Sequence, residues 1–378
     1  MEKGYIKRVL VYSLLSAVNR VIPKKKRIVI YGGPRLYDNN EAMFTYLLEN
    51  TPYDIICLAT KHKEYELRRN VKFVPATNMN AIRYIMTSTV QIDSFLHAVR
   101  MRPGKKQLFI QLWHGTPLKK IVKTQERDGA YYTKILYPSK FYIREYMKTF
   151  AAKRKQMFLN GMPRNDFLFK PMRGSFLEKY DGIKVLWMPT YRHAFGTEET
   201  KRDIPVIDEK NIAELDSYLN EKGITLFLKP HPAQRGSFKG LIKENLRNII
   251  LIDDNMLDEH GVVLYSFIGA MDALITDYSS VYFDYLLLDR PIGFAIDDVE
   301  EYRKNRGFVF DNILDYMPGE KIFSFDELKT FFDHLQQGQD DYSEKRKKVN
   351  DLVNHWQDAG NCERCKVMID DFMKQDNN

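Results

Sequence analysis

Short apolar runs alternate with helical stretches along the whole sequence, and this alternation restricts the possible folds more than any other feature. Eleven apolar runs are expected to form buried strands, at residues 27–33, 54–60, 71–76, 90–94, 107–114, 157–160, 184–189, 225–229, 249–253, 273–276 and 291–296. Helical patterns lie between them, among others at 40–50, 139–151, 207–222 and 280–289. Strands that alternate with helices predict parallel sheets with helices on both faces.

The chain has 378 residues, which is enough for two such domains. We therefore expect an α/β fold with two doubly wound sheets of five or six strands each. The expected first domain is 27–170 and the second is 171–378, which includes the C-terminal helices. The boundary is expected near 170–181, where the sequence KPMRGSFLEKYDG separates the two sets of strands.

The first 26 residues form a basic, amphipathic segment that precedes the first expected strand. Residues 5–22 carry apolar side chains on about one helical face, and basic residues surround this stretch at Lys3, Lys7, Arg8, Arg20 and 24–27. Two interpretations are open: a helix that lies on an anionic membrane surface, and an ordinary helix packed on the protein. No run reaches the roughly 20 apolar residues of a membrane span, and no signal-peptide cleavage site follows.

Net charge and cysteine content limit the classes of function. The formal charge of +8 suits an anionic partner, such as a phosphorylated substrate or a membrane surface, although a solvated basic surface would have the same charge. The basic charge and PKKKR also suggest nucleic acid, but no recognition motif accompanies them. The three cysteines imply no disulfide framework, which fits a reducing cytosol. Cys362 and Cys365 are expected in the first turn of a C-terminal helix, without a metal.

His114 marks the most informative strand end, in the sequence LWHGTPLKK. A histidine that leaves a buried strand would face the crevice where doubly wound sheets bind ligands, with a pKa suited to proton transfer. Gly115 permits close backbone approach, and Pro117 suits the first turn of a helix. A histidine that only forms a local hydrogen bond is the alternative.

Other expected strand ends carry cations, hydroxyls and helix N-termini. The residues singled out there are Arg164, Asp166, Pro189, Thr190, Lys229, His231, Ser279, Ser280 and Asp284. Such groups can bind a diphosphate and stabilise its charge, although the serines could instead be ordinary helix caps. Neither a Walker-type phosphate loop nor a D-x-D pair occurs in the chain, so a metal held by paired aspartates is not supported.

The ordered motifs WHGTPLKK, GMPRND, MPTYR, KPHP and ITDYSSVYFDYLLLDRPIGF resemble those of the CDP-glycerol glycerophosphotransferase family of teichoic acid synthesis. DNNEAMFTYLLE near the start is a further match. The resemblance covers about residues 27–325. It implies a GT-B-type architecture, with two Rossmann-like domains that face each other across a cleft. The first would be the acceptor-side domain and the second the CDP-glycerol-binding domain.

The resemblance also implies which residues act. The donor-binding residues would be His114, Gly115, Thr116, Pro117, Leu118, Arg164, Pro189, Thr190, Lys229, His231, Ser279, Ser280 and Asp284. His114 is expected to be the general base and His231 a second catalytic residue, and neither a metal nor another cofactor is expected. The protein would attach peripherally to the cytoplasmic face of the bacterial cell membrane.

The implied reaction is transfer of glycerol phosphate from CDP-glycerol to an acceptor linked to undecaprenyl diphosphate, with release of CMP. A short lead-in before the catalytic part resembles the priming type of enzyme, which adds the first unit to a lipid-linked disaccharide. Alternatives are a glycerol- or ribitol-phosphate polymerase of teichoic acid or capsule, and another GT-B enzyme that uses a nucleotide sugar. A basic membrane- or nucleic-acid-binding protein without catalysis is the alternative of another class.

Overall fold

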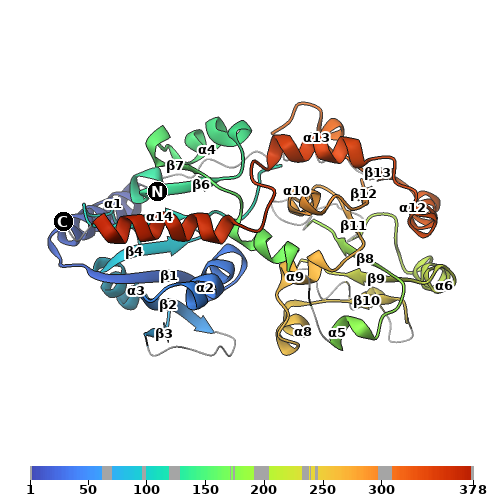
Figure 1. Ribbon diagram of the computed structural model, residues 1–378, viewed down its shortest axis with the longest axis horizontal. Helices are drawn as coiled ribbons and strands as arrows, with labels where there is room; N and C mark the ends of the chain where they lie inside the picture. Colours follow the sequence, from blue (N-terminus) through green and yellow to red (C-terminus); the bar gives the residue numbers. More distant parts are fainter. Residues whose placement is uncertain are drawn as a thin grey trace. The chain divides into compact units, whose positions relative to one another are not determined.

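The computed structural model describes residues 2–61, 70–95, 99–118, 128–170, 172, 175–190, 204–231, 238, 240–242, 246–296 and 309–375. The chain divides into two compact units, and most of their helices and strands are labelled in Figure 1. The first unit comprises Met1–Gly115, Ile121–Asp166 and Val353–Asn378, and the second comprises Thr116–Lys120 and Phe167–Leu352.

The first unit contains a parallel sheet of seven strands in the order β3-β2-β1-β4-β5-β6-β7. The strands are β1 (Lys25–Arg35), β2 (Asp54–Lys61), β3 (Val71–Val74), β4 (Ser88–Asp93), β5 (Leu108–Gln111), β6 (Lys134–Tyr137) and β7 (Met157–Leu159). Its helices are α1 (Glu2–Val21), α2 (Asp38–Asn50), α3 (Asn78–Met86), α4 (Ile143–Phe150) and α14 (Asn361–Gln375). The strand order reverses between β1 and β4, which is where doubly wound sheets bind ligands.

The second unit contains a parallel sheet of six strands in the order β10-β9-β8-β11-β12-β13. These are β8 (Ile183–Met188), β9 (Ile224–Leu228), β10 (Ile249–Leu251), β11 (Ala273–Thr276), β12 (Ile292–Ala295) and β13 (Glu320–Ile322). The helices are α5 (Ser175–Glu178), α6 (Ile212–Lys222), α8 (Asp254–Glu259), α9 (Leu264–Gly269), α10 (Val281–Tyr285), α12 (Phe325–Gln337) and α13 (Ser343–Val353). In this sheet the order reverses between β8 and β11.

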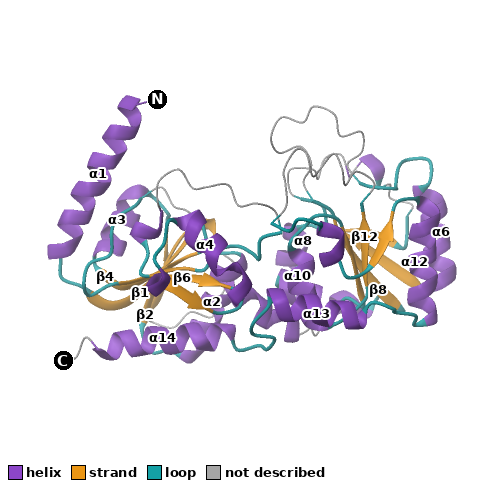
Figure 2. Ribbon diagram, turned by 90° about the horizontal axis from the view of Figure 1, so that it is seen from above, coloured by secondary structure: helices purple, strands orange, loops and turns teal. Residues whose placement is uncertain are grey.

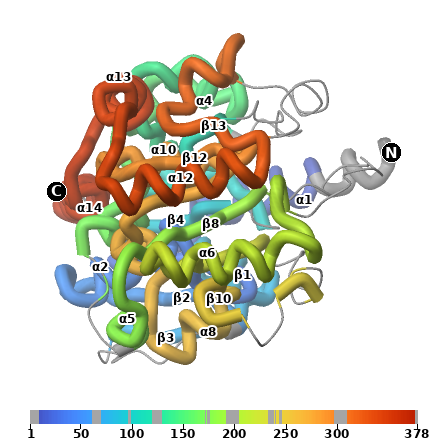
Figure 3. Tube along the Cα trace, turned by 90° about the vertical axis from the view of Figure 1, so that its right-hand side faces the viewer, coloured from blue at the N-terminus to red at the C-terminus, as the bar shows by residue number. Residues whose placement is uncertain are grey.

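Buried apolar side chains join the sheets to their helices. In the second unit, α6 and α12 lie side by side over the strands, as Figure 3 shows, and Leu215 and Phe331 are buried in their shared core with Trp187 of β8. Figure 2 shows helices on both sides of the strands in each unit, which is the doubly wound arrangement that the sequence predicts.

All eleven expected strands are present, and two more complete the sheets. β6 and β13 were not expected; both are short, and β13 reads Glu-Lys-Ile, without an apolar run. The first sheet therefore has seven strands and not the five or six expected.

The expected division of the chain is wrong at its C-terminal end. The domain 171–378 was expected to keep the C-terminal helices, but α14 belongs to the first unit, where it packs against α2. The reason is a set of buried hydrogen bonds that join Asn160, directly after β7, and Asp166 to the first turns of α14. They are described below.

Candidate functional site

The predicted strand 107–114 ends earlier than expected, because the chain bends sharply before His114. β5 stops at Gln111, and Trp113 has a φ of +62°, a left-handed conformation that a bulky side chain rarely adopts. Gly115 follows with a φ of +145°, which favours glycine. The bend lies at the carboxyl end of β5, and it turns the His114 side chain to the surface of the unit.

The His114 imidazole stands against two aromatic rings. It stacks on Phe95 with ring centroids 4.9 Å apart and an interplanar angle of 3°, and the Trp113 ring centroid lies 4.0 Å away. Its Nδ1 atom lies 3.4 Å from the carbonyl oxygen of Ser94, at the end of β4. These contacts fix the plane of the ring. The other ring nitrogen, Nε2, forms no hydrogen bond with the described residues.

The surroundings of His114 favour the neutral imidazole. Desolvation by neighbouring protein atoms is the main cause that lowers its pKa to about 4, the positive charge of Arg164 lowers it further, and the Ser94 carbonyl opposes the shift. Because His114 is nevertheless exposed, water reaches the ring, favours the charged form and limits this shift. The sign is the same in either case: the imidazole is neutral at pH 7 and can accept a proton.

Arg164 contacts the bend from the 3₁₀ turn Pro163–Phe169. Its Nη1 atom donates to the carbonyl oxygen of His114 at 3.0 Å and to Asp38 Oδ1 at 2.6 Å. Asp38 begins α2 with a φ of +58°, so a second left-handed residue lies at the same place. Binding of a diphosphate by Arg164 stays a prediction; its guanidinium donates to the bend and pairs with Asp38.

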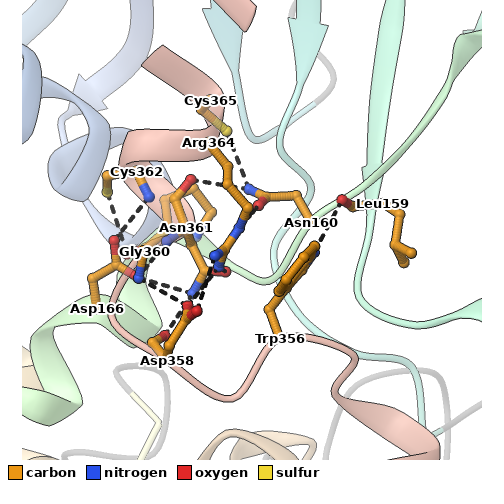
Figure 4. Close-up of polar contacts among 11 residues, drawn as sticks. Leu159, Asn160, Asp166, Trp356, Asp358, Gly360, Asn361, Cys362, Arg364 and Cys365 are labelled. Atoms are coloured by element: carbon orange, nitrogen blue, oxygen red, sulfur yellow. Dashed lines mark hydrogen bonds and ion pairs between the residues drawn. The ribbon is translucent and has the colours of Figure 1, made fainter. Parts of the chain in front are cut away.

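Asp166, which the sequence placed beside Arg164 at one strand end, has a different partner. Its carboxylate accepts hydrogen bonds from the backbone N–H groups of Asn361 (3.0 Å) and Cys362 (2.8 Å) and from the Asn361 side chain. Figure 4 shows this cluster at the first turn of α14, with Asn160 bonded to the Asn361 carbonyl oxygen and to Cys365 Sγ. The GMPRND segment therefore joins the bend to the C-terminal helix.

The two cysteines lie in the first turn of α14, as predicted. Both are buried, and burial raises the pKa of the Cys365 thiol, so that it stays protonated. Within the described residues, no three His, Cys, Asp or Glu side chains are grouped so that they could hold a metal ion.

The second unit presents a different set of groups at the carboxyl edge of its sheet. Lys229 follows β9, is 7% exposed and pairs with Asp254 at the start of α8, with Nζ and Oδ1 2.9 Å apart. His231 is exposed two residues later, and desolvation and the charge of Lys229 lower its pKa. Thr190 follows β8, and its backbone N–H donates to the buried Asp277 after β11, at 2.9 Å.

Ser279 and Ser280 follow β11 at the point where the strand order reverses. Ser280 precedes α10 without capping it through its side chain, and Ser279 Oγ lies 3.5 Å from the Val281 N–H. Both serines are half-buried. Ser279 therefore accepts one backbone hydrogen bond at the start of α10, as the capping interpretation predicts, whereas the Ser280 side chain does not cap the helix. Pro189 lies at the neighbouring strand end, after β8.

Asp284 is more deeply buried than a residue that contacts the donor should be. It is fully buried, and its Oδ2 accepts from the Tyr265 hydroxyl at 2.8 Å. Direct contact with a donor molecule would need a change that exposes this carboxylate.

The WHGTPL motif is divided between the units. His114 and Gly115 belong to the first, whereas Thr116, Pro117 and Leu118 belong to the second, where the Leu118 carbonyl oxygen accepts from the Val309 N–H at 2.9 Å. The helix expected from Pro117 onward falls mainly on residues 119–127, which are outside the described residues.

Sequence analysis did not identify the buried residues whose hydrogen bonds support the bend. Asn39 is fully buried and donates from Nδ2 to the Trp113 carbonyl oxygen at 2.9 Å. Asp93, also fully buried, accepts from Gln111 Nε2 at 2.7 Å. The only signal was the match DNNEAMFTYLLE, which contains Asn39.

Two doubly wound α/β units with polar groups at their carboxyl edges define a protein of the GT-B type. The family model described as CDP-Glycerol:Poly(glycerophosphate) glycerophosphotransferase matches residues 14–369, and the chain belongs to this family.

Curated relatives and a solved structure agree with this assignment. The chain is 26% identical over 337 residues to the teichoic acid poly(glycerol phosphate) polymerase of Bacillus spizizenii, covering 80% of this chain and 82% of that protein. It is 27% identical over 326 residues to the teichoic acid ribitol-phosphate primase of the same species, covering 79% of each. A structure of the wall teichoic acid polymerase TagF superposes with a TM-score of 0.76 at 20% identity, over 98% of this chain and 94% of that one, which shows the shared fold.

Proposed function

We propose that this protein transfers glycerol phosphate from CDP-glycerol to a hydroxyl group of a lipid-linked acceptor in teichoic acid synthesis and releases CMP. The observation that carries the proposal is the strained bend after β5, which presents a neutral imidazole at the carboxyl edge of a sheet in a chain of this family. Strained backbone of this kind is concentrated at functional sites. TagF has also been solved with CDPG, which supports the choice of donor.

The proposed step is a substitution at the phosphorus that carries glycerol. The acceptor oxygen forms a bond to this phosphorus, the bond to the bridging oxygen breaks, and CMP leaves with that oxygen. His114 takes the hydroxyl proton. Lys229, His231 and the Ser279–Ser280 turn bind the diphosphate and stabilise the charge on CMP, as cations and N–H groups do for phosphates elsewhere.

We propose the priming step, in which one unit is added to an undecaprenyl-diphosphate-linked disaccharide. The length of the chain does not separate priming from polymerisation, because it covers similar shares of a polymerase and of a primase. The test is incubation with labelled CDP-glycerol and the lipid-linked disaccharide, with the units per acceptor counted by mass. One unit is expected. Many units would show a polymerase, and the absence of transfer would refute the proposed reaction.

A ribitol-phosphate donor is the second candidate, because a ribitol-phosphate primase is among the relatives at similar identity. The same assay with CDP-ribitol separates the two donors. UDP-sugars in place of CDP-glycerol test for a nucleotide-sugar transferase. A non-catalytic binding protein would turn over none of these donors.

Replacement of Ser280 by leucine is expected to weaken CDP-glycerol binding at least about tenfold, because the side chain would fill the approach to the turn after β11. Isothermal titration measures the affinity. Ser217, exposed on α6 of the same unit, gives the control variant Ser217→Leu. An unchanged affinity of Ser280→Leu would show that this turn does not bind the donor.

We further propose that α1 attaches the protein peripherally to the cytoplasmic face of the bacterial cell membrane. α1 turns polar side chains toward its own unit. Asn19 Nδ2 donates hydrogen bonds to the Arg102 carbonyl oxygen and to Gln107 Oε1, and Ser16 Oγ accepts one from the Arg102 N–H. Its apolar side chains point outward, with Leu10 and Leu14 each 65% exposed. This is the reverse of a helix packed by its apolar face, and it supports the membrane interpretation. None of the described helices is long and apolar enough to span a bilayer.

The double change Leu10→Glu and Leu14→Glu is expected to weaken binding to anionic phosphatidylglycerol vesicles by at least about tenfold, since each buried leucine contributes about 1.5–3 kcal/mol. Vesicle flotation measures the bound fraction. Met79, which is 82% exposed on α3, provides the control Met79→Glu. Equal binding of the double variant and the control would place the attachment elsewhere.

A further inference from the structure

Side chains from four different elements hold the backbone of the bend. Each of the four side chains forms a hydrogen bond with one backbone group of Trp113, His114 or Gly115. The contacts are Trp113 N–H to Gln111 Oε1 (2.9 Å), Asn39 Nδ2 to the Trp113 carbonyl oxygen (2.9 Å), Arg164 Nη1 to the His114 carbonyl oxygen (3.0 Å) and Tyr146 hydroxyl to the Gly115 carbonyl oxygen (3.2 Å). Such a conformation persists only where its surroundings determine it fully.

Among these side chains, Asn39 holds two parts of the site at once. Its Nδ2 donates to Trp113, and its Oδ1 accepts from the backbone N–H of Arg164 at 3.0 Å. The amide therefore links the bend to the segment from which Arg164 reaches the His114 carbonyl oxygen. A carboxylate or an apolar side chain of this size could not make both contacts, because one needs a donor and the other an acceptor.

The position of Asn39 is itself fixed. Asn40, the next residue of α2, donates to the Tyr31 carbonyl oxygen of β1 at 2.8 Å and accepts from Ser94 Oγ after β4 at 2.9 Å. The start of α2 is thus tied to the two strands between which the sheet order reverses. Ser94 is also the residue whose carbonyl oxygen lies against His114 Nδ1.

We propose that Asn39 is a positioning residue: its side-chain amide sets the conformation of the Trp113–His114 bend and so places the His114 imidazole for proton transfer. The role in catalysis rests on the proposed function; the effect on the histidine does not. Among the described residues, the charged group that acts on the ring is Arg164, from the 3₁₀ turn, and Arg164 pairs with Asp38 of α2. Loss of the Asn39 contact would let the ring move away from Phe95 and into water.

The test compares Asn39→Asp with Asn160→Asp. Both asparagines are fully buried in the first unit. In each, Oδ1 accepts one bond, from Arg164 or Arg364, and Nδ2 donates one to a backbone carbonyl oxygen, at 2.9 Å to Trp113 and 3.1 Å to Asn361. Each Nδ2 also donates to a sulfur atom, of Met162 or of Cys365. Aspartate keeps the accepted bond and loses both donated bonds in each variant, but only the first change touches the bend.

Two readouts are measured in the full-length protein. For Asn39→Asp, kcat is expected to fall about 100-fold, as misplacement of a reacting group by about 1 Å can do, with little change in the KM for CDP-glycerol. NMR titration of ¹³C-labelled histidine is expected to show the pKa of His114 rising toward its ordinary value. Asn160→Asp should keep the wild-type kcat and the wild-type His114 pKa while losing thermal stability.

The outcomes separate the two proposals. If Asn39→Asp matches Asn160→Asp in both readouts, Asn39 does not position the histidine. Because the new carboxylate of Asn39→Asp would by itself raise the pKa of a nearby imidazole, the neutral variant Asn39→Ser is measured as well. If the His114 pKa rises in both variants but the wild-type protein transfers no glycerol phosphate, the positioning role stands and the proposed reaction fails. Should Asn39→Asp not fold, Asn39→Ser, which is neutral and too short to reach both partners, takes its place with the same two readouts.

Discussion

Replacement of His114 by alanine is expected to reduce glycerol phosphate transfer by about 10²–10⁴-fold in kcat, the usual contribution of a positioned general base. The fold should survive, because the bend is held by contacts to its backbone and not to the imidazole. CDP-glycerol binding should remain close to that of the wild type. Steady-state kinetics and titration calorimetry measure the two effects separately.

The control for this experiment is His355→Ala, because His355 is an exposed histidine of the same unit, on the segment before α14. The pH profile gives a second check. A lowered pKa keeps the imidazole neutral to lower pH, so activity should be lost only as the pH falls below about 6.5 and toward the lowered pKa. Near-normal turnover in His114→Ala would remove this residue as the base.

Replacement of Asp166 by alanine is expected to loosen the attachment of α14. Asp166 is 7% exposed and accepts three hydrogen bonds at the first turn of this helix, where N–H groups have no partner within the helix. Burial raises the pKa of this carboxyl, and the hydrogen bonds oppose that shift, so burial offsets part of the stabilisation. We expect a net loss of about 2 kcal/mol, within the usual range for a helix cap.

Hydrogen exchange of the α14 amides measures this loss locally, without assuming that both units unfold together. Protection in 361–375 should fall about 30-fold, which is the equivalent of about 2 kcal/mol. Asp358→Ala is the matched control, since Asp358 lies in the same cluster as an exposed partner of Arg364 and should contribute under about 1 kcal/mol. Equal protection in both variants would contradict a special role for Asp166.

The local sequence pattern was sufficient to predict the alternating strands and helices of the two sheets. Buried parallel strands are continuous apolar runs, and the eleven runs in the sequence are all strands. The pattern failed for β13, whose three residues include a glutamate and a lysine and which, among the described strands, pairs with β12 alone at the edge of the sheet. Its place is fixed by its neighbour and not by its own composition.

The candidate site was predictable only in part, for a related reason. His114 was expected at a strand end and lies at one, but no local rule shows that the strand stops at Gln111 and that Trp113 takes a left-handed conformation. That conformation depends on Asn39, which is 74 residues away in the chain. Likewise, Arg164 and Asp166 are two residues apart but hold different structures, and nothing in PRND reveals that Asp166 caps a helix 195 residues later.

The return of the chain to the first unit has a consequence for biosynthesis. The ribosome makes the first seven strands, then the whole of 167–352, and only afterwards the helix that Asp166 caps. Domains fold as units during synthesis. Residues 167–352 can therefore finish folding before the first unit, which contains His114, is complete. Until α14 has been made, the surface of the first unit that this helix covers stays exposed, where chaperones can bind it.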